Sequence, residues 1–258
     1  MATYVYGIMR AGDATRALSA ITDAEAANAD VLEHEDVAAL VGALPDTKVR
    51  LGRERILGHA NVLQAAFAHG PVLPLRLGTV LPDDDAVVGE LLAPRAQALA
   101  ARLDALDGKA EMQVKAVYRE EPLLRSILDS DPTLRRRVDR NRGLPAAATH
   151  FDQIRIGEAI AHSVQARQAA DGEALLSSLR PLAVAVSVSR PHHERAVLNA
   201  AFLVNSDDLE QFDAEVERLS EEHGASLEFK LIGPLPAYSF ADGEWEAVGT
   251  TTKGAGWA

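Results

Sequence analysis

The stretch Lys230-Leu-Ile-Gly-Pro-Leu-Pro-Ala-Tyr-Ser-Phe240 decides how the C-terminal half of this 258-residue chain is organised. Around its start, apolar residues at every second position alternate with Glu228 and Lys230, which is the period of a strand with one buried and one solvent-facing side. The Gly-Pro-Leu-Pro run then predicts a rigid exit from that strand, followed by two aromatic residues. We interpret Tyr238 and Phe240 as core plugs that cover the end of a sheet, with a binding platform as the alternative.

The C-terminal half that contains this stretch predicts the element order β-α-β-β-α-β, with extra helices after its first strand. In chain order, we expect strands over residues 112–118, 183–189, 196–204 and 227–231, and helices around 122–128, 132–142, 151–170 and 205–223. The last helix has the clearest ends, because Asn205 and the acids after it form a start signal and Gly224 a stop signal. Its predicted apolar stripe consists of Leu209, Phe212, Val216 and Leu219.

The N-terminal half predicts the order β-α-β-β-α-β-α. We expect strands over residues 3–9, 30–34, 36–41 and 71–77, and helices over 14–20, 56–67 and from Asp83 to about Leu106. The segment 36–41 could equally be a helical turn. In the second helix the apolar stripe consists of Ile56, Ala60, Leu63 and Phe67, and Gly70 ends the helix. Pro94 bends or restarts the third helix.

Two modules with the same element order indicate an α+β fold with a duplicated architecture. We expect two ferredoxin-like (βαββαβ) modules, each with four antiparallel strands that carry helices on one face. The boundary falls at Asp107–Gly108, which gives an N-terminal domain over 1–107 and a C-terminal domain over 108–240. The second domain has a helical insertion at about 120–180. A tail over 241–258 holds both tryptophans, and composition predicts mobility there unless it docks on another surface.

Composition and charge exclude several classes of protein. Hydrophobic residues make up 47% and charged residues 25%, as in ordinary globular proteins. The formal net charge of −12 makes nucleic acid and anionic membranes unfavourable partners. The basic run Arg135–Arg137 with Arg140 and Arg142 is interpreted as a solvated helix face or a local ion-pair cluster, with a phosphate site as the minority alternative. The absence of cysteine, of a leader and of a long apolar segment predicts a cytoplasmic protein.

No combination of side chains in the sequence predicts a catalytic, cofactor or metal site. The run His192-His193-Glu194 lies in an expected hairpin loop, where neighbouring side chains point apart, so we interpret it as a solvated loop. His59 and His69 are expected at or near the surface. Arg76 lies between apolar residues in Pro74-Leu-Arg-Leu77, where an unpaired charge would be costly if buried. We expect it to pair with a carboxylate or with backbone carbonyl groups, and the alternative is a functional anchor.

The solvent-facing side of the second predicted sheet is the one place where the sequence brings charged residues together in a regular pattern. Glu111, Gln113 and Lys115 are expected beside Glu228 and Lys230 on neighbouring antiparallel strands. Cross-strand ion pairs are the plain interpretation, and a ligand pocket or a partner-binding face is the alternative.

Four segments together resemble the gas vesicle protein F/L family in order and spacing. They are Tyr4-Val-Tyr-Gly-Ile8, Pro71-Val-Leu-Pro-Leu-Arg-Leu-Gly-Thr-Val80, Gly108-Lys-Ala-Glu-Met-Gln-Val-Lys115 and the stretch 230–240. Leu77 stands where the family commonly has an aromatic, and Leu235 where it commonly has a tryptophan. Both changes keep an apolar side chain, so they affect local packing and leave the resemblance intact.

The resemblance implies an accessory protein that assembles gas vesicles, the flotation organelles whose walls consist of protein, and it implies no enzyme and no cofactor. The implied partners are the hydrophobic shell protein and other accessory proteins, in the cytoplasm and at the gas vesicle. Our hypothesis is that the chain covers apolar shell subunits before they assemble. The candidate anchors are Arg76, Lys115, Glu228, Lys230, Tyr238 and Phe240. The alternative is a small-molecule-binding or metal-dependent enzyme or regulatory module on the same fold, with convergent groups around Lys115, Glu228 and His192.

Overall fold

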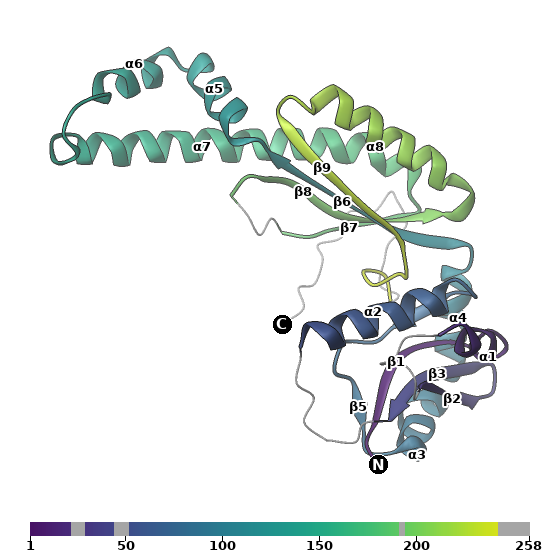
Figure 1. The fold of residues 1–258 in the computed structure, drawn as a ribbon. Coiled ribbons are helices and arrows are strands. Elements are labelled where there is room, and N and C mark those ends of the chain that lie inside the picture. The colour runs from purple at the N-terminus through teal and green to yellow at the C-terminus, as the bar shows by residue number, and fades with distance from the viewer. Residues whose placement is uncertain (22–28, 44–51, 191–193, 242–258) are drawn as a thin grey trace. The chain divides into compact units, whose positions relative to one another are not determined.

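The computed structural model describes residues 1–21, 29–43, 52–190 and 194–241 (Figure 1). The chain is an α+β protein with two antiparallel sheets, which confirms the predicted fold class. Its contacts divide into two compact units. Among the described residues, unit 1 is drawn from 1–112, 203–207 and 233–241, and unit 2 from 113–202 and 208–232. The domain boundary at Asp107–Gly108 stays a prediction.

The first sheet is built around its N-terminal strand. Its strands are β1 (Thr3–Arg10), β2 (Ala29–His34), β3 (Val37–Ala43), β4 (Val72–Pro74) and β5 (Val80–Leu81). The strand order is β2-β3-β1-β4, β5 also pairs with β1, and every pairing is antiparallel. The strand predicted over 71–77 is therefore shorter than expected. Residues Leu75–Thr79 form a turn instead, with Gly78 at a φ of 91° that favours glycine.

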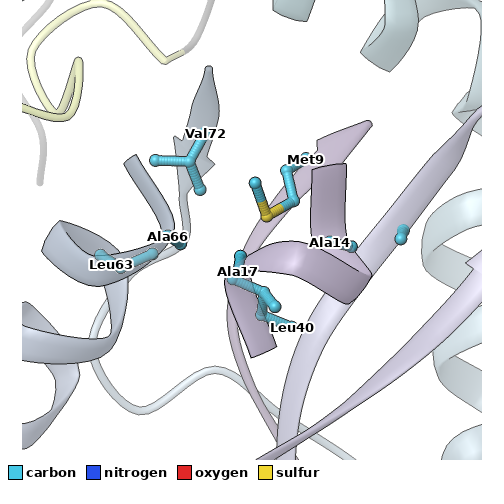
Figure 2. Close-up of a cluster of buried hydrophobic side chains, with 8 residues drawn as sticks. Met9, Ala14, Ala17, Leu40, Leu63, Ala66 and Val72 are labelled. Atoms are coloured by element: carbon cyan, nitrogen blue, oxygen red, sulfur yellow. The ribbon is translucent and has the colours of Figure 1, made fainter. Parts of the chain in front are cut away.

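Helices α1 (Ala11–Ala20) and α2 (Arg53–Phe67) pack on one face of this sheet. Figure 2 shows the core between them, where side chains from β1, α1, β3, α2 and β4 meet. This cluster consists of Met9, Ala14, Ala17, Ala38, Leu40, Leu63, Ala66 and Val72. The buried face of α2 differs from the predicted stripe, because Ile56 is 50% exposed while His59 is only 7% exposed. The buried face of α2 carries His59 together with Val62, Leu63 and Ala66.

The other face of the first sheet is covered as well, which corrects the expectation of helices on one face only. The first six residues of β3, Val37 to Gly42, are all buried, although successive side chains point to opposite faces. Helix α4 (Ala96–Leu106) contacts β1, β3 and β4, and the π-helical turn Val87–Leu92 contacts β2 and β3. A strand without polar residues on either side can be buried on both faces, and β3 is such a strand.

The helix predicted from Asp83 to about Leu106 is divided into short helical turns and α4, with the predicted restart at Pro94. Helix α3 (Asp84–Ala86) begins at Asp83, whose side chain accepts a hydrogen bond from the Ala86 amide at 2.8 Å. The 3-10 turn Ala93–Arg95 contains Pro94 and separates the π-helical turn from α4. Pro94 lacks the amide hydrogen that a continuous helix needs, so the bend follows from the sequence.

The second sheet repeats the strand order of the first. Its strands are β6 (Lys109–Tyr118), β7 (Ala185–Val188), β8 (Ala196–Asn205) and β9 (Leu227–Leu235), in the order β7-β8-β6-β9. In both sheets the first strand in the chain lies between the third and the fourth, and the second strand forms an edge. This shared order agrees with the predicted βαββαβ duplication.

The described residues of the second half contain four α-helices. They are α5 (Glu120–Ser130), α6 (Pro132–Asn141), α7 (Ala146–Leu179) and α8 (Leu209–His223). Helix α8 buries Phe212, Val216 and Leu219, as its stripe predicted. Helix α7 is longer than expected, and α5 and α6 contact it (Figure 1). We call residues 120–167, which comprise α5, α6 and the N-terminal part of α7, the helical arm.

Candidate interaction surfaces

A buried carboxylate holds the C-terminal turn of the chain in unit 1. Glu111 in β6 is fully buried, and both of its oxygens accept hydrogen bonds from Ser239. The Ser239 amide donates to Oε2 at 2.6 Å, and its hydroxyl donates to Oε1 at 3.0 Å. A buried charge is costly unless hydrogen bonds satisfy it, so this pair of bonds ties the turn to the strand.

Two further hydrogen bonds fasten the same segment. Gln64 Nε2 donates to the Pro234 carbonyl at 3.2 Å, and Arg102 Nη1 donates to the Ala241 carbonyl at 3.4 Å. Both donors lie in helices of unit 1. The expectation that Glu111 faces water is therefore wrong, because the chain after β9 folds back over it.

The two aromatic residues of this turn behave differently. Phe240 is 2% exposed, as expected of a core plug. Tyr238 is 38% exposed, so part of its ring remains at the surface. Burial, and then the negative charge of Glu111, raise the pKa of Tyr238 to about 12. Tyr238 and Phe240 as interaction anchors stay predictions.

The charged residues on the second sheet do not form the expected ion pairs. The Arg119 amide donates to the Ser226 carbonyl at 2.8 Å, so the end of β6 faces the beginning of β9. Counting along both strands from this bond places Lys115 opposite Lys230 and Glu228 diagonal to Lys115. Within the described part of the chain, none of these three exposed side chains joins an ion pair. The sequence pattern showed which face they share but did not reveal their register.

A buried hydrogen-bond network joins β1, α2 and the turn before β5. The Tyr4 hydroxyl lies 2.8 Å from His59 Nδ1 and 3.3 Å from the Gly78 amide, which donates to it. Because the Tyr4 oxygen accepts from Gly78, its hydroxyl hydrogen is free to be donated to His59 Nδ1. His59 accepts this hydrogen bond as a neutral imidazole. The expectation that His59 lies at or near the surface is wrong, because Tyr4 supplies the polar partner that lets an imidazole be buried.

Burial sets the ionisation of this network. It lowers the pKa of His59, and a backbone hydrogen bond with Leu75 opposes this effect. Burial also raises the pKa of Tyr4. Arg76 lies in the same turn, and it is exposed. Its carbonyl accepts hydrogen bonds from the Thr79 amide at 3.0 Å and from the Thr79 hydroxyl at 2.8 Å. The role of Arg76 as an anchor stays a prediction.

Side-chain bonds that sequence reasoning missed fasten α7 to its neighbours in unit 2. The Tyr118 hydroxyl donates to the Asp171 carboxylate, and burial first and this carboxylate second raise the pKa of Tyr118. Arg167 donates to the hydroxyls of Ser126 at 2.7 Å and Ser130 at 2.6 Å on α5. These partners lie 37 to 53 residues apart in sequence, too far for any local pattern to pair them.

The helical arm exposes apolar side chains. Phe151 is 80%, Leu144 51% and Ile154 46% exposed. A smaller exposed pair lies on α2 in unit 1, where Ile56 is 50% and Leu57 52% exposed. Large exposed apolar residues that occur together are typical of binding surfaces.

Helix α6 on the same arm is basic. Arg135 forms an ion pair with Asp129 at 2.9 Å, and Arg136 donates to the Pro132 carbonyl at 3.1 Å. Arg137 and Arg140 are exposed and have no ion-pair or hydrogen-bond partner among the described residues. The interpretation of this run as a solvated helix face with a local ion pair agrees with these contacts.

The described residues provide no metal cluster and no membrane span. Within 1–21, 29–43, 52–190 and 194–241, no three His, Cys, Asp or Glu side chains are placed to hold a metal ion. His192 and His193, like Trp245 and Trp257, lie outside these ranges. None of the described helices combines the length and the apolarity that crossing a bilayer requires.

Comparison with known sequences gives one consistent match. The family model described as "Gas vesicle synthesis protein GvpL/GvpF" matches residues 2–242. Gas vesicle protein F of Streptomyces sp. (strain CB03234) is 36% identical over 246 residues, which cover 94% of this chain and 100% of that protein. Gas vesicle protein F of Dolichospermum flosaquae is 28% identical over 196 residues, which cover 75% of this chain and 79% of that protein.

Comparison with solved structures gives the same fold. The crystal structure of the gas vesicle protein GvpF from Anabaena sp. PCC7120 has a TM-score of 0.73 at 24% identity, and covers 93% of this chain and 98% of its own. That of GvpF from Microcystis aeruginosa has a TM-score of 0.72 at 23% identity, with the same coverage of 93% and 98%.

Proposed function

Since the chain belongs to the gas vesicle GvpL/GvpF family, whose model matches residues 2–242, we propose that it binds the gas vesicle shell protein and keeps shell subunits dispersed until a growing wall accepts them. The family is one of gas vesicle accessory proteins and is not a known enzyme family. Other accessory proteins of the same system are the further proposed partners.

The observation that carries the proposal is this family match along almost the entire chain. The net charge and the exposed apolar side chains support the proposed binding and dispersal of shell subunits. A net charge of −12 keeps copies of the chain, and complexes that contain it, from associating with one another. Exposed apolar side chains such as Phe151 suit contact with an apolar polypeptide. A protein with both features can cover a hydrophobic subunit and keep it in solution.

The test is co-expression of the shell protein with and without this chain. We expect the fraction of shell protein that stays in the supernatant after high-speed centrifugation to rise when the chain is present. A matched control is an unrelated acidic protein of similar size, which should leave that fraction unchanged. An equal fraction with the chain and with the control would refute the dispersal role.

Genetic removal gives a second readout. Cells of a vesicle-forming host that lack this chain and its close paralogues should form fewer or no gas vesicles, counted by electron microscopy. Vesicles normal in number and shape in such cells would exclude an accessory role in assembly.

A further inference from the structure

We propose that the tip of the helical arm, residues 132–156, is the docking surface for an acidic amphipathic helix of a partner polypeptide. The tip comprises α6, the loop after it and the first three turns of α7. This inference rests on the proposed function, because it assigns one surface on which a partner in gas vesicle assembly binds.

The first observation is a helix face that loses its partner. In the C-terminal half of α7, Gly172 lies so close to β8 that a Cβ there would be 2.8 Å from the Val197 carbonyl oxygen. Ile154 precedes Gly172 by 18 residues, which is five helical turns, so both lie on the same face of α7. Figure 1 shows the N-terminal half of α7 extending past the strands of the sheet. The face that packs on the sheet at Gly172 therefore continues along α7 to Ile154, ~27 Å away, and the strands do not extend that far.

The second observation is that this uncovered face begins with apolar residues. Phe151 is 80% and Ile154 46% exposed, and they are three residues apart, so they are neighbours on the helix surface. Glu158, one turn beyond Ile154, ends the apolar part. A polypeptide with its own apolar stripe can cover two such anchors at once.

The third observation is charge. Residues 132–156 contain six arginines (135, 136, 137, 140, 142 and 155) and two aspartates (139 and 152), which gives +4. The chain as a whole carries −12, so the remainder carries −16. Helix α6 contacts α7, so its arginines contribute to the electrostatic potential at a ligand bound to α7, and this contribution weakens as salt rises. A basic tip on an acidic protein favours an acidic ligand.

These observations favour a partner polypeptide over a second copy of this chain. The acidic helix of this chain is α8, with six acidic residues and one arginine between Leu209 and His223. Its apolar residues Phe212, Val216 and Leu219 are already buried in unit 2. A second copy would thus offer charge without a matching apolar stripe. The partner must supply both.

The experiment measures binding of a fluorescein-labelled model peptide to the full chain by fluorescence anisotropy. The peptide is a helix with leucine along one face and glutamate along the other. One variant pairs Phe151→Ser with Ile154→Ser, and a second pairs Arg137→Glu with Arg140→Glu. Each should weaken binding about tenfold or more, because each removes central anchors or reverses charge. Only the arginine variant should also flatten the salt dependence of binding.

Matched controls carry the same chemical changes elsewhere. Ile56→Ser with Leu57→Ser removes two half-exposed apolar residues of α2, and Arg53→Glu with Arg95→Glu reverses two exposed arginines of unit 1. Both should bind the peptide as the wild type does. Circular dichroism and the urea midpoint confirm that each variant folds. Equal weakening in controls and tip variants would overturn the proposal.

Three other results would overturn it as well. The first is equally tight binding of a peptide with lysine in place of glutamate. The second is tip-dependent binding of phosphatidylglycerol vesicles without peptide binding, which would assign the surface to lipid. The third is a wild-type dimer in sedimentation that the tip variants abolish, which would assign the surface to a second copy.

Co-expression with the shell protein separates this inference from the proposed function. If the wild type raises the dispersed fraction of shell protein and the tip variants raise it equally, the inference fails and the function stands. If the wild type does not raise that fraction, the function fails. Reduced dispersal by the tip variants together with weaker peptide binding supports both.

Discussion

Replacement of Glu111 tests whether its carboxylate holds the C-terminal turn. The side chain is fully buried and accepts two hydrogen bonds from Ser239, at 2.6 and 3.0 Å. In Glu111→Gln, the amide oxygen still accepts the Ser239 amide and the amide nitrogen donates to the hydroxyl. Only charge assistance is lost, which costs about 1 kcal/mol. In Glu111→Leu both bonds are lost and the buried amide has no acceptor, which costs about 3 kcal/mol.

The turn opens locally before the whole chain unfolds, so the assay must report on the turn itself. Hydrogen exchange measured by mass spectrometry on a peptide covering residues 236–241 does so. With 1.4 kcal/mol per factor of ten, exchange of the Ser239 amide should become roughly fivefold faster in Glu111→Gln and roughly a hundredfold faster in Glu111→Leu. Glu228→Leu is the matched control, because that carboxylate is exposed on β9. It should leave the rate unchanged.

Two results would refute the reasoning. Equal rates in the Gln and Leu variants would mean that the hydrogen bonds do not hold the turn. Exchange of the wild-type Ser239 amide at the rate of an unstructured peptide would mean that the turn is not docked in solution.

Three further predictions concern pH and packing. Because burial lowers the pKa of His59, its contribution to stability is complete above about pH 6.5 and is lost as pH falls, so the urea midpoint should fall below that pH. An equal fall of the urea midpoint in His59→Leu would contradict the assignment of this pH dependence to His59. The pKa of Tyr238 rises from 10.0 to about 12, so stability should decrease between these pH values in the wild type but much less in Tyr238→Phe, and equal decreases would refute the assignment. In Gly7→Ala the new Cβ would lie 2.9 Å from the Leu73 carbonyl oxygen, so urea unfolding should show a loss of about 2–3 kcal/mol. Gly12→Ala, with nothing within 4 Å, is the control, and equal stability of the two variants would exclude the packing argument.

Much of the fold could be predicted because the signals used are local: apolar and polar residues alternate along strands, and glycine or proline marks the ends of helices. The stripe of α8 and the bend at Pro94 both occur as expected. The four quoted segments also acquire a physical meaning. The first segment contributes Tyr4 and the second contributes Gly78 to one hydrogen-bond network, while the third and fourth contribute Glu111 and Ser239 to another.

The errors have a common cause, since burial by a distant part of the chain leaves no mark on local periodicity. Glu111 follows the alternation of an exposed position, yet a turn 128 residues later covers it. His59 is polar in a helix whose apolar stripe pointed elsewhere, yet Tyr4 neutralises the cost of burying it. The face of β3 covered by α4 did leave a signal, because Val37 to Gly42 contains no polar residue.

The tie between Glu111 and Ser239 also sets an order of events during protein synthesis. At ~5–20 residues per second, the ribosome needs roughly 6 to 25 seconds to add the 128 residues that separate them. Throughout that interval the nascent chain presents an uncovered carboxylate, and the unit that begins at Met1 is still incomplete. A product truncated by premature termination before Ser239 would keep that flaw permanently. Cellular proteases and chaperones therefore have a structural difference by which to tell finished molecules from unfinished ones.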